Sequence, residues 1–116
     1  MNKELNFAVC DDDEIVCEAI CTKISEILTS CGISVSCDKY VSPMSLYNNI
    51  KHGERVYDAL FLDIDMPKID GVELAKALRK NENMVDIIFV SNREDKVFET
   101  FPVRPFGFIR KTNFTH

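Results

Sequence analysis

A run of four apolar residues, from Ala59 to Leu62, ends directly at the carboxylate of Asp63. Short apolar runs of this kind predict strands that are buried on both faces, as in a parallel sheet covered by helices. In open parallel sheets, ligands bind beyond the carboxyl ends of the strands. The sequence therefore predicts an α/β fold in which Asp63 lies at the functional edge of the sheet.

Three further apolar runs also end in reactive side chains. Residues 7–10 lead to Asp11 and Asp12, residues 87–90 lead to Ser91, and residues 106–110 lead to Lys111. Because parallel strands present their carboxyl ends at one edge of the sheet, we expect these side chains to meet Asp63 in a single pocket.

The side chains expected in this pocket suit phosphoryl transfer. Crowded carboxylates repel one another unless a cation is present, and Mg²⁺ prefers oxygen ligands of this kind. With Mg²⁺ held by Asp11, Asp12 and Asp63, the carboxylate of Asp63 is a candidate nucleophile that accepts a phosphoryl group. The hydroxyl of Ser91 and the ammonium of Lys111 are then expected to contact the phosphoryl oxygens.

These motifs together resemble the receiver domain of two-component response regulators. The resemblance covers nearly the whole chain in the right order, and its motifs are Cys10-Asp11-Asp12, Phe61-Leu62-Asp63-Ile64-Asp65-Met66-Pro67, Asp70-Gly71, Val90-Ser91 and Phe108-Ile109-Arg110-Lys111. The segment from Arg104 to Lys111 further resembles receivers whose output is a LytTR-type DNA-binding domain, as in quorum-sensing regulators of Gram-positive bacteria.

The resemblance implies a phosphorylation-controlled switch in transcription regulation, a phosphoacceptor domain and not an enzyme with a substrate of its own. Asp63 accepts the phosphoryl group from a sensor histidine kinase, and Asp65 offers its backbone carbonyl to Mg²⁺. Ser91 and Phe108 then relay the change to the fourth helix and fifth strand. The implied fold is flavodoxin-like, a doubly wound sheet of five parallel strands in the order 2-1-3-4-5.

Two residues flank the path by which water attacks the phosphoryl group in receivers, and here they are Asp65 and Arg93. A bidentate pair between them would hinder the in-line approach of water and so slow dephosphorylation. The alternative is two solvated side chains whose exposed pairing contributes little.

The chain departs from the receiver pattern in three places. Thr112 follows Lys111, where receivers commonly have a proline that orients the lysine, and Phe108 lacks the hydroxyl of a tyrosine. The chain also stops at His116, where the family has a fifth helix. We therefore expect a single receiver domain over residues 1–116, with the last helix truncated and the output domain absent. An uncovered apolar face of this kind favours association of two copies of the chain as a homodimer.

Other functions remain open for the same residues. Asp63-x-Asp65 also suggests an aspartyl-phosphate phosphatase of the haloacid-dehalogenase kind, although that motif normally lies on the first strand of its fold. A pseudo-receiver that only binds partners is a further alternative. Residues 11–14 could be a plain acidic first turn of a helix, and Ser91 could be a plain N-cap of the fourth helix.

Composition limits the classes of partner that this segment is expected to bind. The net charge is −5, without a basic stripe, so this segment is a poor candidate for binding nucleic acid itself. No apolar stretch is long enough to span a bilayer, and no signal peptide precedes the first strand, so we expect a cytoplasmic protein without a membrane contact. Five cysteines in a reducing compartment predict free thiols, and no second Cys or His pair completes a zinc site.

Periodicity predicts the elements between these motifs. Strands are expected over residues 5–10, 33–40, 59–63, 87–90 and 106–110, with a helix after each of the first four. The first helix is expected to bury Ile15 and Ile27 among other apolar residues and to end at Gly32. Ser42-Pro43 and Asp70-x-x-Glu73 are expected to begin the second and third helices. The short fourth helix is expected to bury Val97, Phe98 and Phe101.

Overall fold

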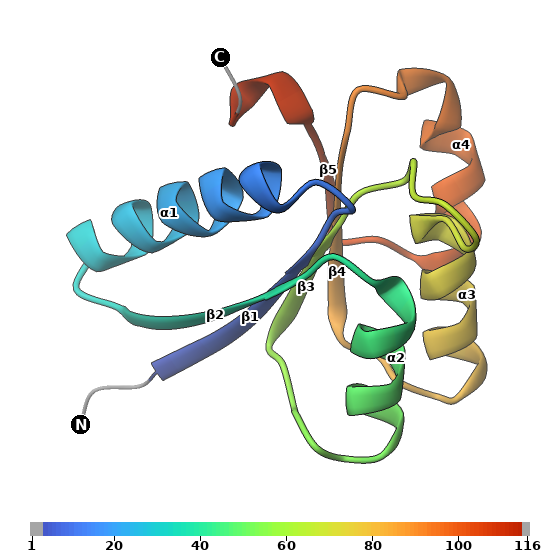
Figure 1. The fold of residues 1–116 in the computed structure, drawn as a ribbon, viewed down its shortest axis with the longest axis horizontal. Helices are drawn as coiled ribbons and strands as arrows, with labels where there is room; N and C mark the ends of the chain where they lie inside the picture. Colours follow the sequence, from blue (N-terminus) through green and yellow to red (C-terminus); the bar gives the residue numbers. More distant parts are fainter. Residues whose placement is uncertain (1–3, 115–116) are drawn as a thin grey trace.

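Five parallel strands form one sheet in the order β2-β1-β3-β4-β5 in the computed structural model, which describes residues 4–114 (Figure 1). The strands are β1 (Glu4–Cys10), β2 (Ser34–Tyr40), β3 (Ala59–Leu62), β4 (Asp86–Ser91) and β5 (Gly107–Arg110). Each neighbouring pair is parallel. The predicted fold class and strand order are confirmed.

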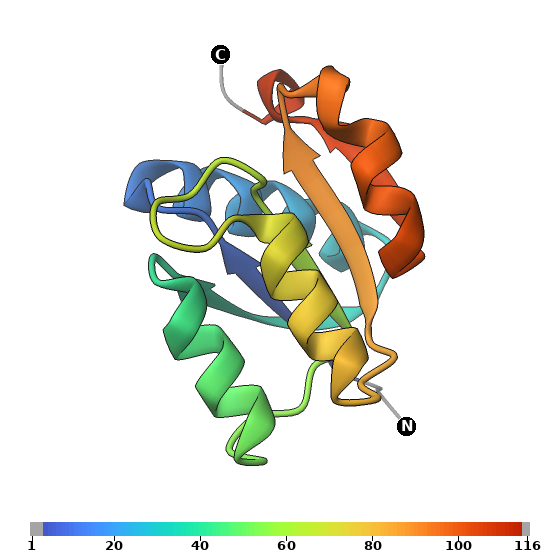
Figure 2. The ribbon, with the colours of Figure 1, turned by 90° about the vertical axis from the view of Figure 1, so that its right-hand side faces the viewer.

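Helices cover both faces of the sheet. They are α1 (Glu14–Ser30), α2 (Pro43–Lys51), α3 (Gly71–Lys80) and the one-turn α4 (Val97–Thr100). Figures 1 and 2 show α1 on one face, and α2, α3 and α4 on the other. None of the described helices is long and apolar enough to cross a bilayer.

The helix starts follow from their capping residues. Ser42 caps α2, with Pro43 in its first turn, because the serine hydroxyl accepts the amide of Ser45. Asp70 and Glu73 form a complete capping box at the start of α3. These local signals were readable in the sequence, and the structure confirms them.

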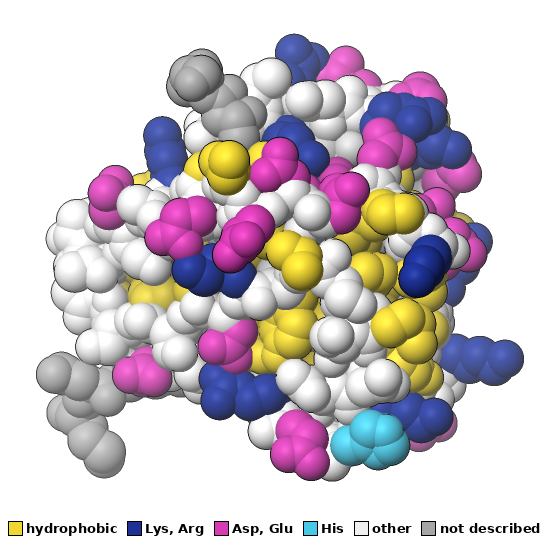
Figure 3. Space-filling view, in the orientation of Figure 1, with side chains coloured by type: hydrophobic (Ala, Val, Ile, Leu, Met, Phe, Trp, Pro, Cys, Tyr) yellow, Lys and Arg dark blue, Asp and Glu magenta, His cyan; other side chains and the backbone are white. Residues whose placement is uncertain are grey.

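The core forms two layers, one on each side of the sheet. All four residues of β3 are buried, as a strand between two helical layers requires. Figure 3 shows that apolar side chains on the face it draws lie between groups of charged ones, and that lysines and arginines there are interspersed with acidic residues.

Four residues predicted for the core are instead at the surface. The exposed fractions of Ile15 and Ile27 in α1 are 80% and 52%, and those of Phe98 and Phe101 are 77% and 57%. Ile15 lies in the first turn of α1, and α4 is too short for a helical stripe because 3-10 segments flank it. Thr100 and Val103 are buried in this region instead.

The prediction of free thiols is wrong for two of the five cysteines. Cys21 and Cys37 form a disulfide, with their Cα atoms 6.0 Å apart, while Cys10, Cys17 and Cys31 are free. The pair forms because α1 packs against β1 and β2 with Cys21 on its buried side. This packing brings Cys21 next to Cys37 of β2, which lies 16 residues further along the chain.

A groove remains open between α1 and the sheet. It forms a cavity of about 350 Å³. Apolar residues dominate its lining, which consists of Phe7, Ile24, Ile27, Leu28, Ala59, Phe61, Ile88 and Phe106 together with Asp58 and Asp86. After β5 the described chain holds a single 3-10 turn, Lys111–Asn113. The groove lies where an uncovered apolar face was expected, and residues 115–116 lie outside the described part.

Candidate functional site

Three carboxylates meet at the carboxyl edge of the sheet. Asp11 and Asp12 follow β1, and Asp63 follows β3, its neighbour in the sheet. The amide of Asp63 donates to the carbonyl of Cys10 at 2.9 Å, which extends the pairing of the two strands to the site. One carboxylate oxygen from each residue lies within 4.8 Å of the others, so the expected acidic cluster is present.

Burial is the main cause of a raised pKa at Asp63. Its exposed fraction is 3%, and Asp11 is fully buried, whereas Asp12 is exposed. Loss of solvation raises the pKa of Asp63 from 3.8 to about 6, and the charge of Asp11 adds to the rise. The ammonium of Lys111 offsets part of this effect.

Lys111 lies between the two buried carboxylates. Its Nζ is 2.8 Å from Asp11 Oδ2 and donates to Asp63 Oδ2 at 3.1 Å. Burial alone would lower the pKa of this ammonium, but its contacts with both carboxylates outweigh the desolvation and raise it. Lys111 therefore contacts both carboxylates although Thr112, and not a proline, follows it in the chain. The described residues contain no cis peptide bond.

The donor set fits a hard divalent cation. Asp11 Oδ1 accepts the amide of Asp13 at 2.9 Å, and Asp11 Oδ2 is paired with the ammonium of Lys111 at 2.8 Å. Asp11 and Asp63, both buried, share this one ammonium, so their negative charge exceeds its positive charge and favours a bound cation. Asp11, Asp12 and Asp63 together supply the carboxylate oxygens that Mg²⁺ prefers.

Ser91 ends β4, the strand beside β3, and its exposed fraction is 1%. Its hydroxyl accepts the amide of Arg93 at 3.1 Å. The 3-10 turn that leads into α4 begins only at Glu94 and has no side-chain cap, so Ser91 is not the N-cap of the fourth helix.

Phe108 belongs to β5 and is half-buried. In the strand register it lies beside Phe89 of β4, and it packs against the core layer that contains α3. The ring thus lies on the side of the sheet that carries α3 and α4, two positions before the end of β5, and Lys111 follows that strand directly.

Gly71 contributes more to the site than its sequence context suggested. A Cβ atom at this position would overlap the backbone carbonyl of Asp63. The first residue of α3 can approach Asp63 this closely only because it has no side chain. The dipeptide Asp70-Gly71 was part of the recognised motif, but nothing in the sequence showed which backbone atom the glycine approaches.

The predicted pair between Asp65 and Arg93 exists, with one correction. Arg93 Nη1 lies 3.0 Å from Asp65 Oδ1, but the bidentate contact is with Asp95, through Nε and Nη2 at 3.0 Å each. Asp95 is only two residues away and presents both oxygens to the guanidinium, whose proximity lowers the pKa of Asp95. All three side chains are exposed to solvent.

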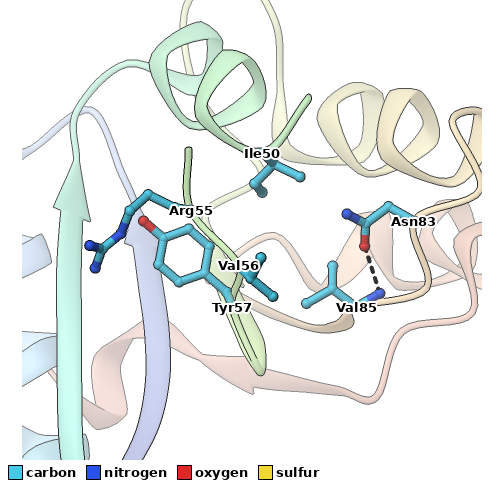
Figure 4. Close-up of a pocket in the computed structure, with 6 residues that line it drawn as sticks. All are labelled: Ile50, Arg55, Val56, Tyr57, Asn83 and Val85. Carbon is cyan, nitrogen blue, oxygen red and sulfur yellow. Dashed lines mark hydrogen bonds between the residues drawn. The ribbon is translucent and has the colours of Figure 1, made fainter. Parts of the chain in front are cut away.

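A separate cavity of about 230 Å³ lies at the opposite edge of the sheet (Figure 4). Tyr57 and Val85 line it, and they precede β3 and β4 in the chain, whereas Asp63 and Ser91 lie where those strands end. The acidic cluster contributes no residue to this cavity.

Comparison with known proteins relates this geometry to one family. The sequence model described as "Response regulator receiver domain" matches residues 7–114. Stress response regulator protein 1 of Scheffersomyces stipitis is 32% identical over 90 residues, which are 76% of this chain and 29% of that protein. Transcriptional regulatory protein YpdB of Escherichia coli is 35% identical over 54 residues, 47% of this chain and 22% of that protein. The chain thus spans less than a third of the length of either relative.

A solved structure agrees in fold. It is the response regulator protein TrrA from Thermotoga maritima in complex with Mg²⁺-BeF, and it superposes with a TM-score of 0.67 at 23% identity. The match covers 91% of this chain and 85% of that one.

Proposed function

The chain belongs to the response regulator receiver domain family, and from this premise we propose that Asp63 is its phosphoacceptor. Receiver domains are phosphoacceptor modules of two-component signalling, and they pair with histidine kinases. The observation that carries the assignment is the position of Asp63 at the carboxyl end of β3, buried beside Asp11 and bonded to Lys111.

Asp63 acts as the nucleophile, and Lys111 and Ser91 stabilise the phosphoryl group that it accepts. The carboxylate attacks the phosphorus of the donor, and the bond from phosphorus to the donor's leaving group breaks. Lys111 moves its charge from the Asp11 and Asp63 carboxylates toward the phosphoryl oxygens, where it stabilises the charge of the transferred group. The hydroxyl of Ser91 donates to another of these oxygens.

Three carboxylates and one backbone carbonyl form the proposed metal site. Asp11, Asp12 and Asp63 would hold Mg²⁺ through their side chains, and Asp65 would hold it through its carbonyl. The bound ion would neutralise charge on the phosphoryl oxygens. The approach of one carboxylate oxygen from each of Asp11, Asp12 and Asp63 to within 4.8 Å of the others supports this assignment.

Ser91 and Phe108 form the switch in this proposal. When Ser91 turns its hydroxyl to the phosphoryl group, it releases the amide of Arg93, which it accepts at 3.1 Å in the unphosphorylated domain. The turn before α4 then shifts, and Phe108 follows by packing alone because it has no hydroxyl. The surface of α4 and β5 thereby reports phosphorylation.

We also propose a location, an output and an oligomeric state for the protein. The kinase draws its phosphoryl group from ATP, so the domain acts in the cytoplasm, and its output is transcription regulation through a DNA-binding domain of the LytTR type. The match to a transcriptional regulatory protein supports this output. The apolar groove beside α1 further supports a homodimer, detectable by light scattering as a mass that rises with concentration.

Two alternatives are disfavoured by particular observations. A phosphatase of the haloacid-dehalogenase kind carries its acceptor on the first strand, whereas Asp63 follows the third strand in the chain. A pseudo-receiver would not need the hydroxyl and the ammonium, yet Ser91 ends the strand next to β3 and Lys111 contacts Asp63 directly.

Intact-mass measurement tests the proposal. The domain is incubated with Mg²⁺ and acetyl phosphate, and we expect one phosphoryl adduct in the wild type and in Glu54→Gln, a control at an exposed carboxylate away from the site. Asp63→Asn should show no adduct. An adduct that persists in Asp63→Asn contradicts the assignment, and rapid turnover of the phosphate donor without an adduct would favour a phosphatase.

A further inference from the structure

We propose that Asn92 is a positioning residue that holds Lys111 against Asp63, through a hydrogen bond to the amide of Thr112. The proposal deepens the proposed function and rests on the role of Lys111 in it. Asn92 follows Ser91 directly, so the same loop carries the hydroxyl of the site and the residue that positions the lysine.

The backbone ladder of the sheet ends just before Lys111. β5 is the outermost strand of the sheet and pairs with β4 over four residues only. The last pair in this register joins Ser91 to Arg110, so the ladder ends one residue before Lys111. Lys111 itself begins the 3-10 turn that follows.

Asn92 provides the next link between the two segments. Its Oδ1 accepts the amide of Thr112 at 3.2 Å, across 20 residues of sequence. In effect, a side chain continues the connection between β4 and β5 by one step after the backbone ladder has ended. The amide of Thr112 is essential to this link, and a proline at that position would lack it.

Lys111 needs an accurately placed backbone because its ammonium contacts two carboxylates at once, at 2.8 Å and 3.1 Å. Coulomb energy falls with distance, and catalytic geometry is sensitive to displacements of about 1 Å, which can reduce rates by about a hundredfold. The link at Thr112 is one peptide away from the lysine, so its loss shifts the point from which the side chain extends.

The first test follows the hydrogen bond in the metal-free domain. Amide exchange at Thr112, followed by NMR, should be about fivefold faster in Asn92→Ala, as expected when one hydrogen bond of about 1 kcal/mol is lost. Asn92→Asp, which keeps the acceptor oxygen, should restore the wild-type rate. Asn113→Ala, at an exposed position of the same turn, is the matched control and should leave it unchanged.

The second test follows Lys111, which a hydrogen bond of purely local importance would not affect. Reductive methylation of Lys111, quantified by peptide mass spectrometry in the metal-free domain, should be faster in Asn92→Ala than in the wild type and in Asn113→Ala. Phosphorylation by acetyl phosphate should slow by about tenfold, within the range that small misplacements produce.

A double substitution provides the decisive comparison. In a Thr112→Pro background the amide is already absent, so adding Asn92→Ala should change neither the methylation rate nor the phosphorylation rate. A further loss in the double variant would overturn the proposal, as would unchanged Lys111 reactivity in Asn92→Ala. A wild-type domain that takes up no phosphoryl group would instead refute the proposed function, while the exchange and methylation tests would still decide whether Asn92 holds Lys111.

Discussion

Replacing Asp63 with asparagine should stabilise the metal-free domain at neutral pH, although Asp63 is the proposed phosphoacceptor. Burial and the charge of Asp11 raise its pKa to about 6, from 3.8 in an unperturbed carboxyl. Since one pKa unit corresponds to about 1.4 kcal/mol, the ionised carboxylate destabilises the folded chain by about 3 kcal/mol. Asparagine has nearly the same shape without the charge, and Lys111 keeps Asp11 as its partner.

The pH dependence gives the sign of the effect. The folded chain binds the proton of Asp63 more tightly than the unfolded chain does, so this group makes wild-type stability fall as pH rises from 3.8 through about 6. Below 3.8 the carboxyl is protonated in both states, and the two proteins should differ little. Above 6 the difference should reach its full size of about 3 kcal/mol.

Urea unfolding at several pH values, with a chelator present, measures this difference. Carboxyl groups remote from the site are common to both proteins, so their titration cancels. Glu54→Gln, at an exposed carboxylate, should show no such pH-dependent gain. Addition of Mg²⁺ should stabilise the wild type more than Asp63→Asn, because only the wild type retains the full ligand set. A wild-type domain as stable as Asp63→Asn above pH 6 would refute the reasoning.

Three further predictions concern the surroundings of the site. Gly71→Ala should destabilise the domain by about 2 kcal/mol or more, since the new methyl group meets the carbonyl of Asp63; thermal melts test this, and an unchanged melting temperature would contradict the close approach. Cys37→Ser should lower the free energy of unfolding by about 3 kcal/mol by opening a disulfide loop of this length, whereas Cys31→Ser, at a free exposed thiol, should leave it unchanged in urea titrations. Arg93→Ala should speed loss of the phosphoryl group, as measured by intact mass, without changing Mg²⁺ affinity. A slower or equal loss would contradict the idea that the pair of Arg93 with Asp65 hinders the attack of water.

Local sequence patterns predicted most of the fold. The apolar runs indicated the strands, and Ser42-Pro43 and the capping box at Asp70 marked two helix starts, because these signals depend on neighbours within a few residues. The strand order followed from the resemblance to receivers, and it agrees with the right-handed crossovers that parallel strands require. That order in turn brings the residues after β1, β3 and β4 to one edge, which is why the acidic cluster could be predicted.

Contacts between distant segments could be decided only by the tertiary structure. The disulfide of Cys21 depends on how α1 is rotated on the sheet, and the exposure of Phe98 depends on how α4 is shortened by its flanking 3-10 turns. The link from Asn92 to Thr112 requires the side-chain oxygen of Asn92 to lie 3.2 Å from the amide nitrogen of Thr112. Sequence spacing cannot supply such information, because these distances result from the packing of whole elements and not from the conformation of any one segment.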